Sequence, residues 1–385
     1  MDLRKLPAGL DAEGHVNLRR DMIERELGVD LSATQISSSQ IGAADEKNCE
    51  QMFGAVPVPV GLAGPLNIRF SSGEDGEVYL PLATTEGALV ASINRGCKAV
   101  TLSDGATMSS EYVGITRSIA FEVTDAKKDE EEIRRLKPQW KQIAEETSGH
   151  LKILSYDIDS SEGVLFLTIA ADTDEAMGMN MVTIAAQAVA DFLAKELQIP
   201  VLAVAGNVDS DKKPSARTKQ KGRGIRVQAS AIISHNVLND VLKTDAETIL
   251  KTAHAKLQVG SAVAGALGVN LHMANTIAAL YLATGQDIAH VVEGSLGDTS
   301  FERHADGIKI SVDLPAVLVG VRGGGTGLPA QRQCLVLALS PKTRLRPTVQ
   351  LAETVGAVVL AGELSLLAAL SRSHLASAHQ ALGRK

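Results

Sequence analysis

The chain has 385 residues, of which 45% are hydrophobic, 22% are charged and only 3% are aromatic. This composition excludes disorder over most of the chain, and the length suggests roughly two or three domains. A net charge of −7 disfavours nucleic-acid binding unless a local basic patch provides it. Three cysteines, an odd number, indicate a reducing compartment and no disulfide framework.

Targeting and membrane segments are not expected. Residues 1–28 carry charges throughout and lack the apolar stretch of a signal peptide. No run reaches the ~18 uncharged apolar residues that a bilayer-spanning helix needs. We therefore expect a soluble, cytoplasmic protein that does not bind membranes.

The N-terminal part predicts an arm followed by a hairpin. Residues 15–29 have the pattern of a short polar helix, and residues 56–66 predict an irregular strand that ends in a turn. Residues 66–83 then predict a β-hairpin around a polar turn.

A helix is expected next, because apolar residues recur at helical spacing from Leu89 to Val100. Thr84 and Thr85 are plausible N-caps of this helix. That interpretation places Glu86 in the first helical turn.

From residue 117 the sequence changes character and predicts a separate unit. Its elements are a strand at 117–125, a charged helix interrupted near Pro138, strands at 151–158 and 164–171, a helix at 178–197 and a strand at 201–207. This order, βαββαβ, is that of a ferredoxin-like fold.

The remainder predicts mostly helices after a basic loop. Helical periodicity extends over 235–257, 260–284 and 348–382, whereas 308–322 predicts a pair of strands. We therefore expect an α+β protein. Residues 1–116 and 205–385 would form a large, mostly helical domain, with a ferredoxin-like domain inserted at 117–204.

Glu86 is the first candidate for chemistry. A carboxylate near a helix N-terminus often interacts only with the helix dipole, which contributes ~0.3–1 kcal/mol. The alternative is a desolvated carboxyl group that carries a proton at neutral pH.

A basic run that begins at Lys212 is the second candidate. Seven Lys and Arg residues lie between Lys212 and Arg226. A solvated loop is the usual interpretation, and a nucleic-acid patch is a rival that lacks interleaved aromatic residues. Lys212, beside Asp211, could instead stabilise an oxyanion. Ser210 and Lys213 match the spacing of a serine-nucleophile motif, but the K-T-G partner of that motif is missing.

Asp287 and two C-terminal histidines complete the set. An aspartate just after a glycine at a helix end is usually a cap, but burial beside a lysine would make Asp287 a partner in proton transfer. His374 and His379 are five residues apart, which disfavours a metal pair. A terminal histidine is usually a surface residue, and the alternative is that it carries a proton into a site.

Signals for a dinucleotide are suggestive only in combination. The sequence contains no G-x-G-x-x-G fingerprint. Gly178 opens a predicted helix, whose N-terminus could bind a phosphate, and residues 323–327 are rich in glycine.

Taken together, the motifs ATTEG, NRGCKA, EAMGMNM, GNxxxDKKP, GQD and GGGTxL occur in an order that resembles the 3-hydroxy-3-methylglutaryl-coenzyme A reductase family. The similarity extends from about residue 48 to 383 and favours the eukaryotic and archaeal class. It implies that the large domain binds coenzyme A and the small domain binds the dinucleotide. It also implies NADPH as cofactor, with NADH as an alternative, and no metal.

The family reaction takes the thioester to mevalonate and free coenzyme A with two hydride equivalents. The resemblance implies a homodimer, or a higher even oligomer, with the active site at the subunit interface. Lys212 would stabilise the oxyanion, Glu86 would protonate the aldehyde oxygen and Asp287 would couple to both. His379 would protonate the departing thiolate, and His374 matches a different family histidine.

The resemblance also implies binding roles. The hydroxymethylglutaryl group would contact Arg117, Asp211, Lys213, Lys256 and Asn275. Coenzyme A would contact Ser92, Asn94 and Arg95. The dinucleotide would contact Ser148, Gly178, Met179, Asn180, Gly324, Gly325 and Thr326.

Some positions depart from the family pattern. Ala205 replaces the usual serine before GN, and Gly149 replaces an arginine expected to grip the 2′-phosphate, which weakens the preference for NADPH. The dimer motif reads EQMFG at 50–54, and the regulatory serine falls at Lys385. A binding protein without turnover is the rival function, and the intact set of Glu86, Lys212, Asp287 and His379 argues against it.

Overall fold

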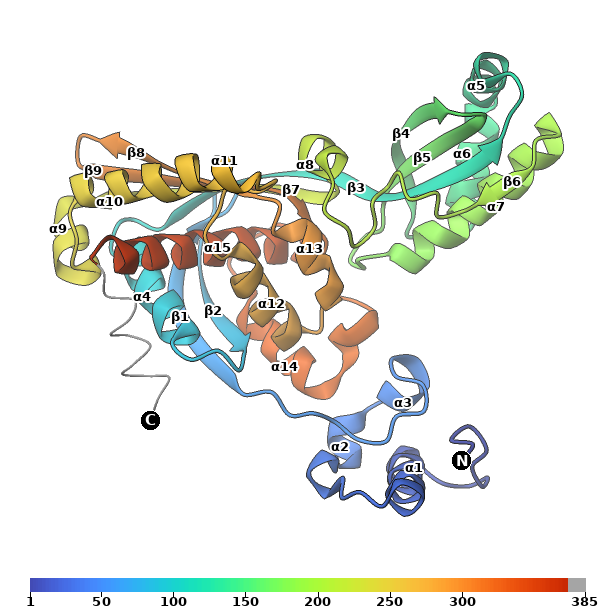
Figure 1. Ribbon diagram of the computed structural model, residues 1–385, viewed down its shortest axis with the longest axis horizontal. Helices are drawn as coiled ribbons and strands as arrows, with labels where there is room; N and C mark the ends of the chain where they lie inside the picture. Colours follow the sequence, from blue (N-terminus) through green and yellow to red (C-terminus); the bar gives the residue numbers. More distant parts are fainter. Residues whose placement is uncertain (373–385) are drawn as a thin grey trace.

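A computed structural model describes residues 1–372. One long strand, β3 (Ala106–Glu122), belongs to both parts of the molecule (Figure 1). Its first half pairs with β7 in the large sheet, and from Ile115 onward it pairs with β5 in the small unit. Two separate hydrophobic clusters lie on either side of this joint.

The large sheet has the order β2-β1-β3-β7-β9-β8, and only the short β1–β3 pairing is parallel. Its other strands are β1 (Val60–Arg69), β2 (Asp75–Ala83), β7 (Gly224–Ser234), β8 (Asp298–His304) and β9 (Gly307–Val317). The expected β1–β2 hairpin is present.

Three helices pack on one face of this sheet: α4 (Leu89–Thr101), α12 (Met273–Thr284) and α15 (Pro347–Ser371). The large domain also has the shorter helices α8 (Ala216–Lys221), α9 (His235–Val237), α10 (Ala246–Ala253), α11 (Ser261–Ala264), α13 (Val291–Gly294) and α14 (Pro329–Leu337). Single turns of 3₁₀ or π-helix are η2 (Leu238–Leu242), η3 (His254–Gly260), η4 (Ile288–His290) and η5 (Gly324–Gly327).

Helix α15 is the centre of the large core. It is long and apolar enough to cross a membrane, but 83% of its most apolar window is buried inside the protein, as in the core helix of a globular domain. Two buried carboxylates on it accept hydrogen bonds from surrounding segments. Glu363 accepts from the backbone N–H groups of Leu271 and His272 and from Thr299 Oγ1, each at 2.8 Å. Glu353 accepts from Ser110 Oγ at 2.6 Å and from the Ser71 N–H at 3.0 Å.

The small unit confirms the expected βαββαβ order. It continues from β3 through α5 (Ala126–Arg135), α6 (Lys137–Glu146), β4 (Lys152–Ser161), β5 (Val164–Asp172), α7 (Met179–Leu197) and β6 (Val201–Ala203). The antiparallel strand order β6-β3-β5-β4 is that of a ferredoxin-like sheet. Pro138 lies in the first turn of α6, where its missing N–H costs nothing.

An N-terminal arm lies apart from the body in Figure 1. It contains α1 (Ala12–Leu27), η1 (Ser32–Thr34), α2 (Ser38–Ile41) and α3 (Ala44–Lys47). A small cluster that includes Val16, Ile41 and Met52 forms its core. The arm reaches the body where Gly42 packs on Pro329 of α14.

Several expectations about elements are wrong. Helix α4 begins at Leu89, and Glu86 lies in the preceding loop rather than in the first turn. The Thr84 hydroxyl accepts a hydrogen bond from the Glu86 N–H, a local turn that competes with helix capping. Ala88 then adopts a left-handed conformation with φ 73°.

The predicted strand pair lies earlier than expected, at β8 and β9, and 308–322 contains only the second strand. The first strand, DTSFERH, is largely polar and lacks the apolar alternation of a half-buried strand. The predicted helices 235–257 and 260–284 are both interrupted. Lys243 in the left-handed region ends η2 before α10 begins, and Gly265 in the same region ends α11 before α12.

The hydrogen bonds of the buried Glu363 carboxylate predict how its replacement changes the free energy of unfolding. Glu363→Leu leaves three donors without their acceptor, so the free energy of unfolding should fall by about 3 kcal/mol or more. Urea unfolding measures this. Glu302→Leu, at an exposed position of β8, is the control and should change stability by less than about 0.5 kcal/mol. Similar losses in both variants would contradict this account of α15.

Candidate active site

Lys212 and Asp287 form an ion pair with 2.7 Å between Lys212 Nζ and Asp287 Oδ2. Lys212 lies in the loop between β6 and α8, and Asp287 follows α12 as the N-cap of η4. Both side chains remain partly accessible, at 42% and 35% exposure, so a substrate can reach the ammonium group. The sequence proposed this pair as oxyanion stabiliser and charge partner, and the structure brings the two residues together.

The backbone at Lys212 is held in the left-handed region, with φ 58°. This conformation costs a non-glycine residue free energy and persists only where surrounding contacts impose it. The Lys212 N–H donates to Glu293 Oε1 at 2.7 Å, and Glu293 is fully buried on α13. Glu293 therefore fixes the main chain of Lys212, while Asp287 holds its side chain.

A buried guanidinium lies beneath this loop. Arg223 Nη1 is 2.6 Å from Glu293 Oε1 and 2.9 Å from Asp211 Oδ1. Arg223 Nε donates to Thr116 Oγ1 of β3 at 2.9 Å, and Nη2 lies 3.0 Å from the sulfur of Met179 at the start of α7. Arg223 thus connects the loop that contains Lys212, the strand β3 shared by both sheets, and the small unit.

Three carboxylates of the site differ in pKa. Partial burial raises the pKa of Asp287, but the Lys212 hydrogen bond and the Ala289 N–H bring it below its usual range. Burial likewise opposes ionisation of Asp211, and Arg223 outweighs it and lowers the pKa of Asp211. For Asp209, burial dominates and raises the pKa despite Arg223 and Arg117. Among these three, the surroundings favour the ionised form of Asp211 and Asp287 and oppose that of Asp209.

Two more predicted substrate contacts lie at this loop, Lys213 within it and Arg117 on the neighbouring strand β3. Arg117 Nη1 is 3.2 Å from Asp209 and 3.6 Å from Asp211, and its Nε donates to Thr183. Lys213 Nζ donates to the Asp211 carbonyl oxygen at 2.7 Å. Together with Lys212, these cations could hold an anionic substrate group next to the reacting carbonyl.

The predicted dinucleotide residues converge on the same region. The backbone N–H groups of Val321 and Arg322 donate to the Glu175 carbonyl oxygen, which places the 323–327 glycine loop beside the turn that opens α7. Gln286 Oε1 accepts a hydrogen bond from the Gly320 N–H at 2.9 Å. This contact links the Asp287 turn to the glycine loop and to the turn that opens α7.

Gly178 precedes α7 with φ 86°, and a Cβ there would lie 2.3–2.5 Å from atoms of Thr173. Only glycine fits this turn, because Thr173 occupies the place of a Cβ, and the turn leads directly into the N-terminus of α7, the kind of position that binds phosphate. Asn180 is exposed on the first turn, whereas Met179 is buried against Arg223. Thr326 Oγ1 donates to the Gly323 carbonyl oxygen within η5, which also contains Gly324 and Gly325. Ser148 Oγ accepts from the His150 N–H on the turn before β4.

Glu86 is not near Lys212 within the chain. Its carboxylate accepts from Asn275 Nδ2 at 2.5 Å, at the start of α12, whereas Asp287 follows the end of that helix. The helix from Asn275 to its last residue spans roughly 14 Å. Glu86 is also exposed. The predicted catalytic residues therefore occupy two separate places on one subunit.

The remaining predictions fall elsewhere. Lys256 is exposed on η3. Ser92 and Arg95 hydrogen-bond to Ser365 of α15, and Asn94 accepts from the Gly64 N–H, so all three hold α4 in place. His374 and His379 lie outside the described residues.

Sequence reasoning missed Asp209, Arg223, His290 and Glu293. In the part of the chain that the structure describes, Asp211, His290 and Glu293 form the one group with metal-ligand geometry, their ligand atoms lying within 4.8 Å of one another. Arg223 already provides the cation between two of them, at 2.9 and 2.6 Å. The two glycines that flank Arg223 could have marked this arginine as unusual. Nothing in residues 290–294 indicates that Glu293 is buried.

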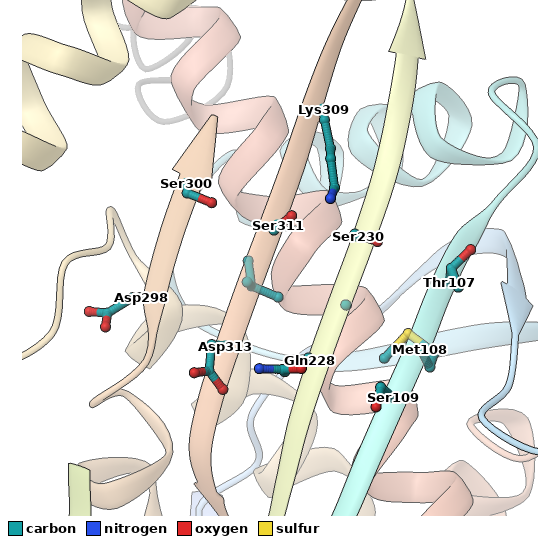
Figure 2. Close-up of a pocket in the computed structure, with 12 residues that line it drawn as sticks. Thr107, Met108, Ser109, Gln228, Ser230, Asp298, Ser300, Lys309, Ser311 and Asp313 are labelled. Carbon is teal, nitrogen blue, oxygen red and sulfur yellow. The ribbon is translucent and has the colours of Figure 1, made fainter. Parts of the chain in front are cut away.

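One cavity lies apart from Lys212, Asp287 and Arg223, and another lies at the margin of this group. One of about 380 Å³ is on the open face of the large sheet, where polar side chains of β3, β7, β8 and β9 line up (Figure 2). It contains none of the predicted site residues. Another of about 290 Å³ lies between the small sheet and α8, and its lining includes Asp157, Asp209, Arg217, Lys221 and Arg223.

A family model described as hydroxymethylglutaryl-coenzyme A reductase matches residues 15–384. The chain is 42% identical over 377 residues to the 3-hydroxy-3-methylglutaryl-coenzyme A reductase of Methanocaldococcus jannaschii, covering 95% of this chain and 92% of that protein. With the enzyme of Haloferax volcanii it shares 40% over 391 residues, covering 99% and 96%. The chain belongs to the hydroxymethylglutaryl-coenzyme A reductase family.

The resemblance drawn from the motifs is thereby confirmed, and so is the α+β fold. A 3-hydroxy-3-methylglutaryl-coenzyme A reductase of Streptococcus pneumoniae superposes with a TM-score of 0.70 at 20% identity, covering 92% of this chain and 96% of that one. Another structure of the class II enzyme from that organism, bound to NADPH in open conformations, gives a TM-score of 0.69 at 21% identity. At these identities the superpositions establish the shared fold.

Gly178 provides a test of the dinucleotide site in this reductase. Gly178→Ala should weaken NADPH binding at least about tenfold, since the methyl group cannot fit against Thr173 without moving the turn. Calorimetric titration with NADPH measures this. Gly149→Ala, where the added Cβ meets open space, is the control and should bind NADPH within about twofold of the wild type. Unchanged binding in Gly178→Ala would place the phosphates elsewhere.

Proposed function

We propose that the chain reduces 3-hydroxy-3-methylglutaryl-coenzyme A to mevalonate and free coenzyme A with two hydride equivalents from NADPH, as in the isoprenoid pathway. The observation that carries the proposal is the Lys212–Asp287 ion pair beside the open N-terminus of α7. A phosphate of a nicotinamide dinucleotide suits this place, because the glycine turn at Gly178, packed against Thr173, leads directly into the N-terminus of α7. The bound dinucleotide supplies the hydride.

Lys212 stabilises the oxygen of the thioester carbonyl as negative charge develops on it. Its ammonium is paired with Asp287 at 2.7 Å, and its position is fixed before substrate binds by the Glu293 contact to its backbone. A preorganised cation contributes most at the transition state, because the charge it faces grows there. Arg117 and Lys213 hold the carboxylate end of the substrate.

The separation of Glu86 from Lys212 supports a site shared between subunits. Glu86 and Asn275 form a pair at one end of α12, and Lys212 and Asp287 form a pair at the other. A two-fold dimer can place the first pair of one subunit against the second pair of its partner. Glu86 then loses its exposure to water, as a group that donates a proton to the aldehyde oxygen requires.

Two roles remain predictions: His379 as the acid that protonates the coenzyme A thiolate, and Lys256 as a contact of the substrate. The coenzyme A contacts of Ser92, Asn94 and Arg95 stay predictions as well. We expect NADPH to be favoured over NADH only modestly, because Gly149 supplies no guanidinium for a 2′-phosphate. A cytoplasmic location also stays a prediction.

Hybrid dimers test the shared site directly. Lys212→Ala and Glu86→Gln should each lower kcat about a hundredfold or more, since each removes a group that acts in the transition state. A heterodimer of the two variants, isolated with two affinity tags, retains one site with both residues intact. It should recover about half of the wild-type rate of NADPH oxidation.

The Lys212→Ala homodimer should still bind coenzyme A nearly as tightly as the wild type, because the contact strengthens only as charge develops. If both groups acted within one chain, every site of the heterodimer would lack one of them. An inactive heterodimer would therefore contradict the shared site, while active wild-type enzyme would still support the reaction.

A further inference from the structure

Arg322 lies where the segment before η5 meets the turn that opens α7. Its backbone pairs with that of Ala176 in a short parallel bridge, and its N–H donates to the Glu175 carbonyl oxygen at 3.1 Å. Two residues earlier, Gly320 packs so closely that a Cβ on it would lie 2.3 Å from the Met177 nitrogen. These contacts fix the main chain of Arg322 beside the residues that lead into α7.

The side chain of Arg322 is exposed, and within residues 1–372 it makes neither an ion pair nor a hydrogen bond. The acids of the turn at 172–178 each have a partner. These pairs are Asp172 with Arg346, Asp174 with His150 and Glu175 with Thr348. Among the charged groups of this junction that the structure describes, the Arg322 guanidinium is therefore the one left to meet a ligand.

A phosphate group at the N-terminus of α7 needs a cation of this kind. The helix is 19 residues long, and its first N–H groups and its dipole favour an anion there. Asp172, Asp174 and Glu175 oppose that anion, because they carry negative charge on the turn that leads into the same helix end. A guanidinium offsets the repulsion, and its planar fork can donate two parallel hydrogen bonds to phosphate oxygens.

The surroundings of Arg322 indicate which part of a dinucleotide it meets. On the same segment, Gly320 donates to Gln286, one residue before Asp287, at 2.9 Å. Ser148, where the 2′-phosphate is expected, lies instead on the turn before β4. A dinucleotide with its nicotinamide at Asp287 and its 2′-phosphate at Ser148 has its pyrophosphate between these ends, at the N-terminus of α7.

We propose that Arg322 binds the pyrophosphate of the nicotinamide dinucleotide at the N-terminus of α7. The inference rests on the proposed function for the place of that cofactor, and it gives Arg322 no part in hydride or proton transfer. NADPH and NADH share the pyrophosphate and differ only at the 2′-phosphate. Arg322 should therefore contribute equally to the binding of both cofactors.

Calorimetric titration of the whole enzyme with NADPH and with NADH tests this role without a measurement of turnover. Arg322→Ala should weaken the binding of each cofactor at least about tenfold, and by factors that agree within about twofold, because both lose the same charge-assisted hydrogen bonds. Arg322→Lys keeps the positive charge without the planar fork, so its affinities should lie between those of Arg322→Ala and the wild type. Arg303→Ala is the control. It removes an exposed arginine of β8, far from α7 in Figure 1, and should bind both cofactors within about twofold of the wild type.

A failure at Arg322 is distinguishable from a failure of the proposed function. If the wild type binds both cofactors and Arg322→Ala binds them equally well, the role of Arg322 is overturned and the proposed function stands. A loss confined to NADPH also overturns it, because that result places the guanidinium at the 2′-phosphate. A wild type that binds neither NADPH nor NADH would instead contradict the proposed function, and the role of Arg322 with it.

Discussion

The buried ion pair between Arg223 and Glu293 is the contact on which the arrangement of the site depends. The two side chains are 1% and 0% exposed and lie 2.6 Å apart. Arg223 also contacts Thr116 of the shared strand, Met179 of α7 and Asp211 of the reactive loop. One guanidinium thus joins the large sheet, the small unit and the loop that presents Lys212.

Such a pair contributes little net stability, because desolvation of both charges offsets their attraction. The pair instead provides a defined geometry. Removal of either side chain leaves the charge of the other buried and uncompensated. Glu293 uses the same oxygen to accept from Arg223 and from the Lys212 N–H. The left-handed backbone at Lys212 is therefore imposed from the buried side and does not depend on bound substrate.

Much of the fold could be predicted from local patterns. The alternation of apolar residues in 117–204 and the turn residues between them specify a βαββαβ order, and the pairing of the strands follows from that order. The ordered motifs identified the family and the residues of the Lys212 loop. Local signals failed where short segments compete. Thr84 forms a turn with Glu86 instead of a cap, and β8 is too polar to show a strand pattern.

The rest could not be predicted because it depends on contacts between distant segments. Glu293 lies in an apolar run, and only the fold brings it against Arg223, 70 residues away. The placement of Glu86 at the far end of α12 from Asp287 likewise depends on how that helix packs on β2. No spacing in the sequence shows that the predicted catalytic residues Glu86 and Lys212 lie apart in one chain.

A cycle of variants at Arg223 and Glu293 tests most directly whether this pair positions the site. Arg223→Met and Glu293→Leu should each lower the free energy of unfolding by about 3–5 kcal/mol, and the double variant should recover most of that stability. Its kcat should nevertheless stay about a hundredfold below the wild type, since the Lys212 N–H has lost its acceptor. Recovery of turnover together with stability in the double variant would contradict the account.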